Sequence, residues 1–190
     1  MAPQRRVGKE SSQTRDQILD AVEACMTRSG YASATYRAVA SQAGVAPSLI
    51  QYYFPTLDDL LVSAVRRRSE QSFQCLVELL RTRPDRPLRV LWEFSKDETD
   101  AALTVELSAL GNHRESVRTE IVDHTRRLRA AQLAALAGTT QLGGMSPSAV
   151  LFLLSGIPKL IKMERGVDVD VGHAETTALV ECLIEQHEPT

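Results

Sequence analysis

Three side chains in the second half of the chain could supply general acid–base chemistry. Glu106, His113 and His124 are of types that exchange protons near neutral pH when their surroundings favour it. No nucleophile motif, glycine-rich phosphate loop or metal-ligand spacing accompanies them. An enzymatic role would therefore rest on residue types alone, and we predict no catalytic residue.

The cysteines and histidines do not form a metal motif. Cys25, Cys75 and Cys182 lie far apart among apolar neighbours. The four histidines include no pair at i, i+4 and no H-E-x-x-H motif. We expect buried, reduced thiols and no metal, disulfide or other cofactor.

A second group of polar side chains is suited to contacting nucleic acid. All four tyrosines lie between residues 31 and 53, and Gln51 stands among them. Glutamine can form two hydrogen bonds with adenine, and hydroxyl groups can donate to phosphate oxygens. No Lys or Arg occurs between Arg37 and Arg66, so attraction for phosphate depends largely on a few other cations. These are Arg5, Arg6, Lys9 and Arg37.

The elements around these residues follow a helix-turn-helix pattern. An apolar stripe with helical spacing predicts a helix from Arg15 to Ser29. Thr35 can cap a short helix that Gly44 ends, and Pro47 opens another that stops before Phe54. Two short helices joined by a tight, glycine-containing turn are typical of DNA-binding proteins.

Residues 14–60 resemble the DNA-binding region of TetR-family regulators. The motifs that carry the resemblance are Ala-Gly-Val at the turn, Tyr-Tyr-Phe-Pro closing the third helix, and Asp-Asp-Leu at the start of the fourth. The resemblance implies that Leu49, Ile50 and Phe54 face a small core. It also implies a set of DNA contacts from the second and third helices: Thr35, Tyr36, Arg37, Ser48, Gln51, Tyr52 and Tyr53.

Three positions depart from the family pattern. Ala46 stands at the N-cap of the third helix, where Ser is usual, so the cap is weaker by roughly 1 kcal/mol. Gln51 replaces a frequent Tyr. Leu57 replaces a frequent Lys, which removes one phosphate contact.

The rest of the chain also predicts helices. Helical spacing recurs over residues 57–81, 88–94, 100–110, 115–137, 149–161 and 173–186, and Pro158 is expected to kink or interrupt its helix. No segment alternates with the period of a strand, so we expect an all-α fold of about nine or ten helices. The expected organisation is a flexible basic arm (1–13), a helix-turn-helix domain (14–57) and an effector-binding and dimerisation domain (58–190).

Polar or aromatic residues among apolar positions are candidates for an effector pocket. His124 falls on the inward stripe of its helix, and Glu106 lies among leucines. The full set of effector candidates is Phe73, Trp92, Glu106, His124 and Phe152. Each is also of a type found in ordinary cores. The basic clusters at 66–68 and 126–127 are expected on solvated helix faces.

The helix at 149–161 is apolar on nearly every face, so it must be covered on two sides. An ordinary monomer core is one explanation. In the resembled family, two such helices from each subunit form a four-helix interface, which implies a homodimer through 147–165 and 173–187. A twofold dimer would read a palindromic operator on double-stranded DNA.

The charge distribution fits a DNA-binding head on an acidic body. Residues 1–57 contain six Lys and Arg against four Asp and Glu, and residues 58–190 contain sixteen against twenty. The longest apolar run is too short to span a membrane and no secretory signal is visible, so we expect a cytoplasmic protein. The resemblance implies a repressor released by an unidentified small molecule. The alternatives are an enzyme or a helical interaction protein without DNA binding.

Overall fold

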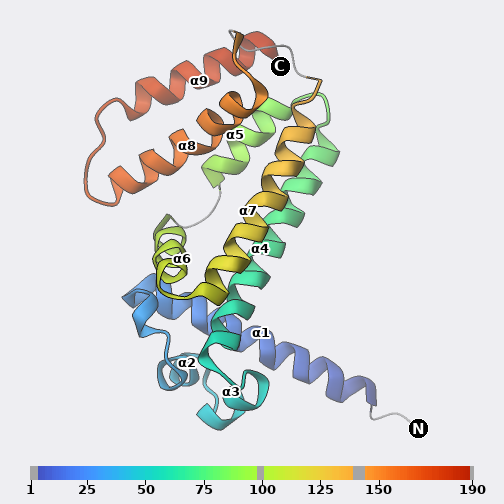
Figure 1. The fold of residues 1–190 in the computed structure, drawn as a ribbon, viewed down its shortest axis with the longest axis vertical. Helices are drawn as coiled ribbons and strands as arrows, with labels where there is room; N and C mark the ends of the chain where they lie inside the picture. The colour runs from blue at the N-terminus through green and yellow to red at the C-terminus, as the bar shows by residue number, and fades with distance from the viewer. Residues whose placement is uncertain (1–3, 98–100, 139–143, 189–190) are drawn as a thin grey trace. The chain divides into compact units, whose positions relative to one another are not determined.

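The computed structural model describes residues 4–97, 101–138 and 144–188, and in these ranges every regular element is a helix (Figure 1). This confirms the all-α prediction. The elements are α1 (Gln4–Ser29), a 3-10 turn η1 (Tyr31–Ser33), α2 (Tyr36–Ala43), α3 (Pro47–Tyr53), α4 (Leu57–Thr82), α5 (Pro87–Asp97), α6 (Ala101–His113), α7 (Glu115–Ala135), α8 (Pro147–Arg165) and α9 (His173–His187).

The helices form two compact units. The first unit comprises residues 1–69 and 103–123, and the second comprises residues 70–102 and 124–190, so α4 and α7 contribute to both. This division differs from the expected boundary at residue 58. The reason is that Leu60 and Leu61 of α4, Leu110 of α6 and Val117 of α7 share one hydrophobic core with the helix-turn-helix residues.

The first helix is longer than its apolar stripe indicated. The stripe predicted a start at Arg15, whereas α1 begins at Gln4 and includes most of the expected arm. Residues 4–13 contain Arg, Lys, Glu and Gln. These residue types have high helix propensity even where the sequence shows no apolar stripe. Two parts of these predictions lie outside the described residues: residues 1–3 of the expected arm, and Asp100 at the start of the helix predicted over residues 100–110.

Local capping fixes the ends of the short helices in the first unit. The Thr35 side chain accepts a hydrogen bond from the Ala38 N–H at the start of α2. Gly44 ends α2 in the left-handed conformation (φ 67°), as expected for that residue type. Thr56 and Asp59 cap α4 reciprocally, since each side chain accepts from the other residue's backbone N–H at 3.0 Å.

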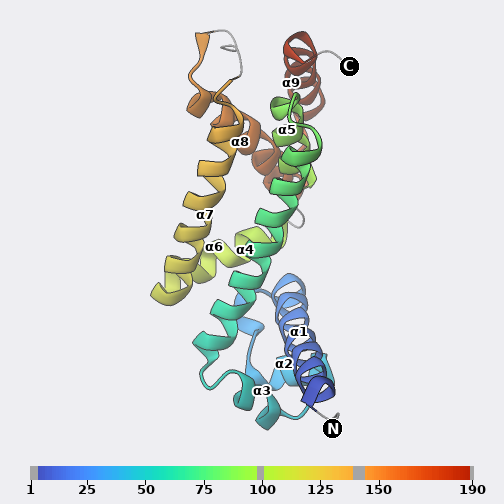
Figure 2. The same cartoon turned by 90° about the vertical axis from the view of Figure 1, so that its right-hand side faces the viewer.

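In the second unit, hydrogen bonds and an ion pair connect the C-terminal part of α9 to α5. The carboxylate of Glu188, directly after α9, accepts hydrogen bonds from the backbone N–H groups of Leu88 (2.7 Å) and Arg89 (2.9 Å). Glu181 accepts from Lys96 and Trp92, and these two bonds lower the pKa of Glu181, the Lys96 bond more strongly. Figure 2 shows α5 and α9 together.

Replacing Glu188 with Ala should destabilise the second unit. The change leaves two N–H groups unpaired in the first turn of α5 and removes a negative charge from the positive end of that helix. We expect a loss of about 1–3 kcal/mol in the free energy of unfolding, measured by urea denaturation. Glu175→Ala, at an exposed position in α9, is the control and should cost about 0.5 kcal/mol. Equal losses for the two variants would contradict this capping role.

Pro158 does not interrupt its helix. α8 continues through it to Arg165, and Pro158 is buried. One face of α8, with Val150, Leu151 and Leu154, packs into the core of the second unit. Other apolar side chains of α8 and α9 remain exposed within the chain, and we call them the apolar face: Phe152, Leu153, Leu160, Met163, Leu179 and Leu183.

Candidate nucleic-acid interface

The third helix presents a polar surface to solvent. Ser48, Gln51 and Tyr52 are all exposed, and Gln51 and Tyr52 follow Ser48 by three and four residues, so they share one side of α3. We call these three residues the reading surface. Ile50 and Phe54, on the other side, are buried in the core of the first unit, as expected, whereas Leu49 is half-buried. The buried side fixes the helix and leaves the reading surface free to meet a ligand.

The start of α2 contributes two further exposed candidates. Thr35 and Arg37 are exposed, and Thr35 also caps the helix. Tyr36 is half-buried, and its hydroxyl donates a hydrogen bond to the Phe54 carbonyl oxygen at 2.9 Å. Burial, and to a lesser extent the charge of Asp59, raises the pKa of Tyr36, so this phenol stays protonated and donating. Tyr36 thus joins α2 to the end of α3.

Tyr52 and Tyr53 have different surroundings. Tyr52 is 79% exposed, whereas Tyr53 is half-buried and packs against the core of the first unit. Their rings meet edge to face with centroids 5.3 Å apart. Tyr53 therefore supports the Tyr52 ring from behind, and the Tyr52 hydroxyl remains available to a partner.

The third helix begins without a side-chain cap. Ala46 occupies the N-cap in an extended conformation, and no side-chain hydrogen bond forms there. This is the weak cap that the sequence predicted, although Pro47 in the first turn removes one N–H that would otherwise need a partner.

Ala46→Ser should stabilise α3. A serine hydroxyl at this position can accept from an N–H of the first turn, and the backbone already has the extended shape that a cap needs. We expect the free energy of unfolding to rise by about 1 kcal/mol, measured by urea denaturation. The same substitution at the exposed Ala130, within α7, provides the control and should give no gain. No gain at Ala46 would contradict the capping argument.

The cations of the first unit are mostly paired with acidic groups. Arg66 bonds Glu120, and Arg67 bonds Asp20 and Glu23 with only 16% of its side chain exposed. Arg114 pairs with Asp58. The expectation of a solvated face is therefore wrong for Arg67. Among the described residues of this unit, the arginines that form no ion pair are Arg15, Arg28 and Arg37. The side chains of Arg5, Arg6 and Lys9 lie outside the description.

Comparison with known proteins agrees with this geometry. Residues 18–64 match the family of bacterial regulatory proteins named tetR. This match covers α2, α3 and the start of α4, where the reading surface lies. Residues 18–64 therefore form a DNA-binding region of the TetR family. This region contains the helix-turn-helix, and the described residues after it are arranged in further helices.

Solved structures share the fold along nearly the whole chain. A transcriptional regulator from Rhodococcus sp. has a TM-score of 0.71 at 17% identity, over 91% of this chain and 95% of that one. A TetR transcription regulator from Haloarcula marismortui gives 0.66 at 16%, over 93% and 98%. The multidrug binding protein EbrR, complexed with imidazole, gives 0.59 at 25%, over 89% and 93%. No curated protein matches the chain.

Two of the acid–base candidates contact the helix-turn-helix domain. Glu106 of α6 accepts a hydrogen bond from the Tyr31 backbone N–H at 2.6 Å. The His113 ring stacks on the Tyr31 ring with centroids 5.7 Å apart. Both side chains thus join α6 to η1 within the first unit. Among the described residues, no group of three His, Cys, Asp or Glu could hold a metal ion.

The five effector candidates do not share one environment. Glu106 belongs to the first unit and the other four to the second. Phe73 is half-buried with the Arg127 guanidinium 3.7 Å from its ring centre, and Trp92 is buried in the core. His124 is half-buried, and Phe152 is 70% exposed on the apolar face.

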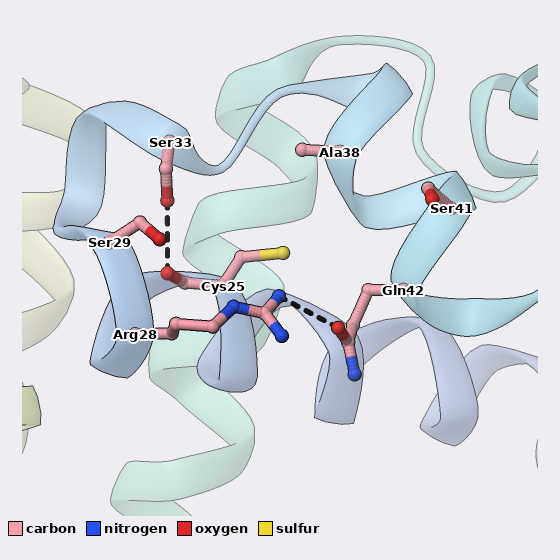
Figure 3. Close-up of a pocket in the computed structure, with 7 residues that line it drawn as sticks. All are labelled: Cys25, Arg28, Ser29, Ser33, Ala38, Ser41 and Gln42. Carbon is pink, nitrogen blue, oxygen red and sulfur yellow. Dashed lines mark hydrogen bonds between the residues drawn. The ribbon is translucent and has the colours of Figure 1, made fainter.

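A surface pocket of about 360 Å³ lies in the first unit between the end of α1, η1 and α2 (Figure 3). Arg28 donates to Gln42 across it at 2.7 Å, and the Ser33 hydroxyl donates to the Cys25 carbonyl oxygen at 2.9 Å. The other lining residues are Ser29, Ala38 and Ser41. None of the predicted site residues lines this pocket.

Sequence reasoning missed two polar residues of α7. Gln132 is buried between Leu128 and Leu136 on the inward stripe, and Arg129 donates to the Ser155 hydroxyl at 2.9 Å. A signal was present, since Gln132 interrupts an i, i+4 series of leucines. Among the described residues, no helix combines the length and apolarity needed to cross a membrane.

Proposed function

We propose that this regulator binds a palindromic operator as a homodimer and that a small molecule releases it, which would make it a repressor. The observation that carries the proposal is the reading surface. Ser48, Gln51 and Tyr52 are exposed together on α3, held by buried neighbours in a chain of the TetR family. Such a helix fits the major groove, where Gln51 can pair with the N6 and N7 atoms of adenine.

The apolar face supports a dimer. Its residues follow each other on α8 with helical spacing, and Phe152, Leu160 and Leu179 are each more than half exposed within the chain. Exposed apolar side chains grouped on two neighbouring helices mark a protein interface. A twofold axis through α8 and α9 would cover both copies of the face at once. The proposed homodimer interface is therefore residues 147–165 and 173–187.

The charge distribution supports modest non-specific binding. Phosphate attraction comes from the cations that carry no acidic partner, and the first unit has few of them. Thr35 and Arg37 at the start of α2 and the tyrosine hydroxyls provide further phosphate contacts. Sequence preference then depends mainly on base contacts and on the spacing of two heads.

Small-molecule control is supported by related folds. EbrR was solved with imidazole, and a similar structure from Saccharomonospora viridis was solved in complex with choline. Because α4 contributes residues to both units, a ligand that changes α4 would affect the helix-turn-helix as well. The coupling between effector and operator should be on the order of 1–3 kcal/mol.

Selection from a library of randomised DNA duplexes tests the proposal. The purified protein should enrich an inverted repeat whose two halves are read by equivalent heads. Enrichment of a single unrepeated site would contradict the dimer, and a pool that stays random would contradict sequence-specific DNA binding.

A further inference from the structure

The buried carboxamide of Gln132 has an unsatisfied hydrogen-bond acceptor. Gln132 is only 3% exposed, and its Oε1 atom is buried without a hydrogen-bond partner. A buried polar group without a hydrogen-bond partner destabilises the folded state. A leucine would extend the apolar series of Leu128 and Leu136 without this cost. The buried, unpaired amide therefore suggests a partner that arrives from outside the chain.

Arg129, one helical turn before Gln132, has few hydrogen-bond partners. Its guanidinium donates to the Ser155 hydroxyl at 2.9 Å, and Ser155 in turn donates to the Leu151 carbonyl oxygen. Arg129 is half-buried, and no carboxylate of the described residues lies within 4.0 Å of it. A guanidinium carries five N–H donors, so most of them remain available.

Five other arginines of the second unit have an acidic partner. Arg127, the near neighbour of Arg129 on α7, bonds Glu70 at 2.6 Å. Acidic partners within 4.0 Å also accompany Arg81, Arg83, Arg86 and Arg89. Arg129 differs from these in being half-buried with a neutral hydroxyl as its partner. A positive charge so placed attracts an anion that the chain itself does not provide.

Residues at i and i+3 on a helix lie side by side, with Cβ atoms about 5–6 Å apart. Arg129 can therefore donate two parallel hydrogen bonds to a planar anion. Gln132 can donate from its NH2 group to the same anion, because rotating the carboxamide by 180° exchanges the positions of NH2 and Oε1. Apolar side chains lie nearby, because Leu136 follows Gln132 by one turn of α7, Leu151 accepts the hydrogen bond of Ser155, and both leucines belong to the core cluster of the second unit. The arrangement favours a molecule with a carboxylate at one end and an apolar body.

We propose that Arg129 and Gln132 recognise the carboxylate of an apolar organic acid, and that this acid is the effector. The inference rests on the proposed function, since it names the chemical class of the ligand for that function. It also separates this chain from the choline-bound relative, whose ligand is a cation.

Binding can be followed through Trp92, the single tryptophan of the chain. Purified protein is titrated with octanoate, decanoate and phenylacetate, and with the primary amide of each as a neutral control. At least one acid should change the Trp92 fluorescence saturably, while its amide binds at least about tenfold more weakly. If no acid binds, or if each amide binds as well as its acid, the inference is overturned.

Two variants assign the site. Arg129→Met should weaken acid binding about ten- to hundredfold, whereas Arg81→Met, at an exposed arginine of the same unit, should bind as the wild type does. Gln132→Leu should weaken acid binding. It should also raise the melting temperature by a few degrees, because it removes a buried amide oxygen that has no hydrogen-bond partner. A purely structural glutamine would give the opposite change in melting temperature, and unchanged acid binding in Arg129→Met would refute the site.

Failure of this inference is distinct from failure of the proposed function. A protein that selects an inverted repeat but binds none of the acids retains its function and lacks this effector class. A protein that binds an acid through Arg129 but selects no DNA sequence has the site without the regulator's activity. The inference also requires that the bound acid lower affinity for the selected duplex, measured by fluorescence anisotropy. An acid that binds without changing DNA affinity would not be the effector.

Discussion

Phe152→Glu is expected to convert the proposed homodimer into a monomer and to lower operator affinity at least about a hundredfold. Phe152 is 70% exposed on the apolar face, and twofold symmetry would place two copies of the substitution in one interface. Each glutamate would have to lose its hydration to be buried there, which opposes association. A monomer keeps one reading head and loses the second half-site.

Sedimentation velocity measures the first effect and fluorescence anisotropy with the selected duplex measures the second. Val77→Glu is the matched control, because Val77 is an exposed valine of α4 in the same unit but not on the apolar face. It should remain dimeric and bind DNA as the wild type does. A dimeric Phe152→Glu protein with unchanged operator affinity would place the interface elsewhere.

Gln51→Ala should abolish most of the preference for the operator. A paired amide–adenine contact contributes about 1–3 kcal/mol, and a dimer makes it twice, so the loss is about thirtyfold to ten-thousandfold in affinity. The effect should be large because α3 carries no Lys or Arg that could take over base reading. Binding to a scrambled duplex should change little, since Gln51 adds no charge.

Anisotropy with operator and scrambled duplexes at one salt concentration provides both values. Gln74→Ala, at an exposed glutamine of the second unit, should leave both affinities unchanged. If Gln51→Ala weakens binding to the two duplexes equally, Gln51 contributes to general affinity and not to base reading.

The parts of the fold that depend on local rules could be predicted from the sequence. Thr35 caps α2 and Gly44 ends it, and Ala46 fails to cap α3, because each effect involves backbone groups within a few residues. The effect of Pro158 was harder to predict. The local rule predicts a kink or an interruption, whereas α8 continues through this buried proline to Arg165. The start of α1 was missed because polar helix and polar coil share a composition.

The parts that depend on distant partners could not be predicted. Arg67 looks like a surface cation until α1 supplies Asp20 and Glu23 beside it. Glu188 becomes a helix cap through residues about a hundred positions earlier in the chain. Arg129 and Gln132 became notable because the fold pairs Arg127 with a carboxylate, gives Arg129 only a hydroxyl, and leaves the Gln132 Oε1 atom without a hydrogen-bond partner. Charge and spacing along one helix do not contain this information.

The affinity ratio between the selected inverted repeat and a scrambled duplex of equal length tests the central claim most directly. Fluorescence anisotropy at about 0.15 M salt gives both dissociation constants under one condition. A dimeric regulator with the reading surface described above should prefer the inverted repeat at least about a thousandfold. A ratio near one would show that this chain does not read DNA sequence and would contradict the account.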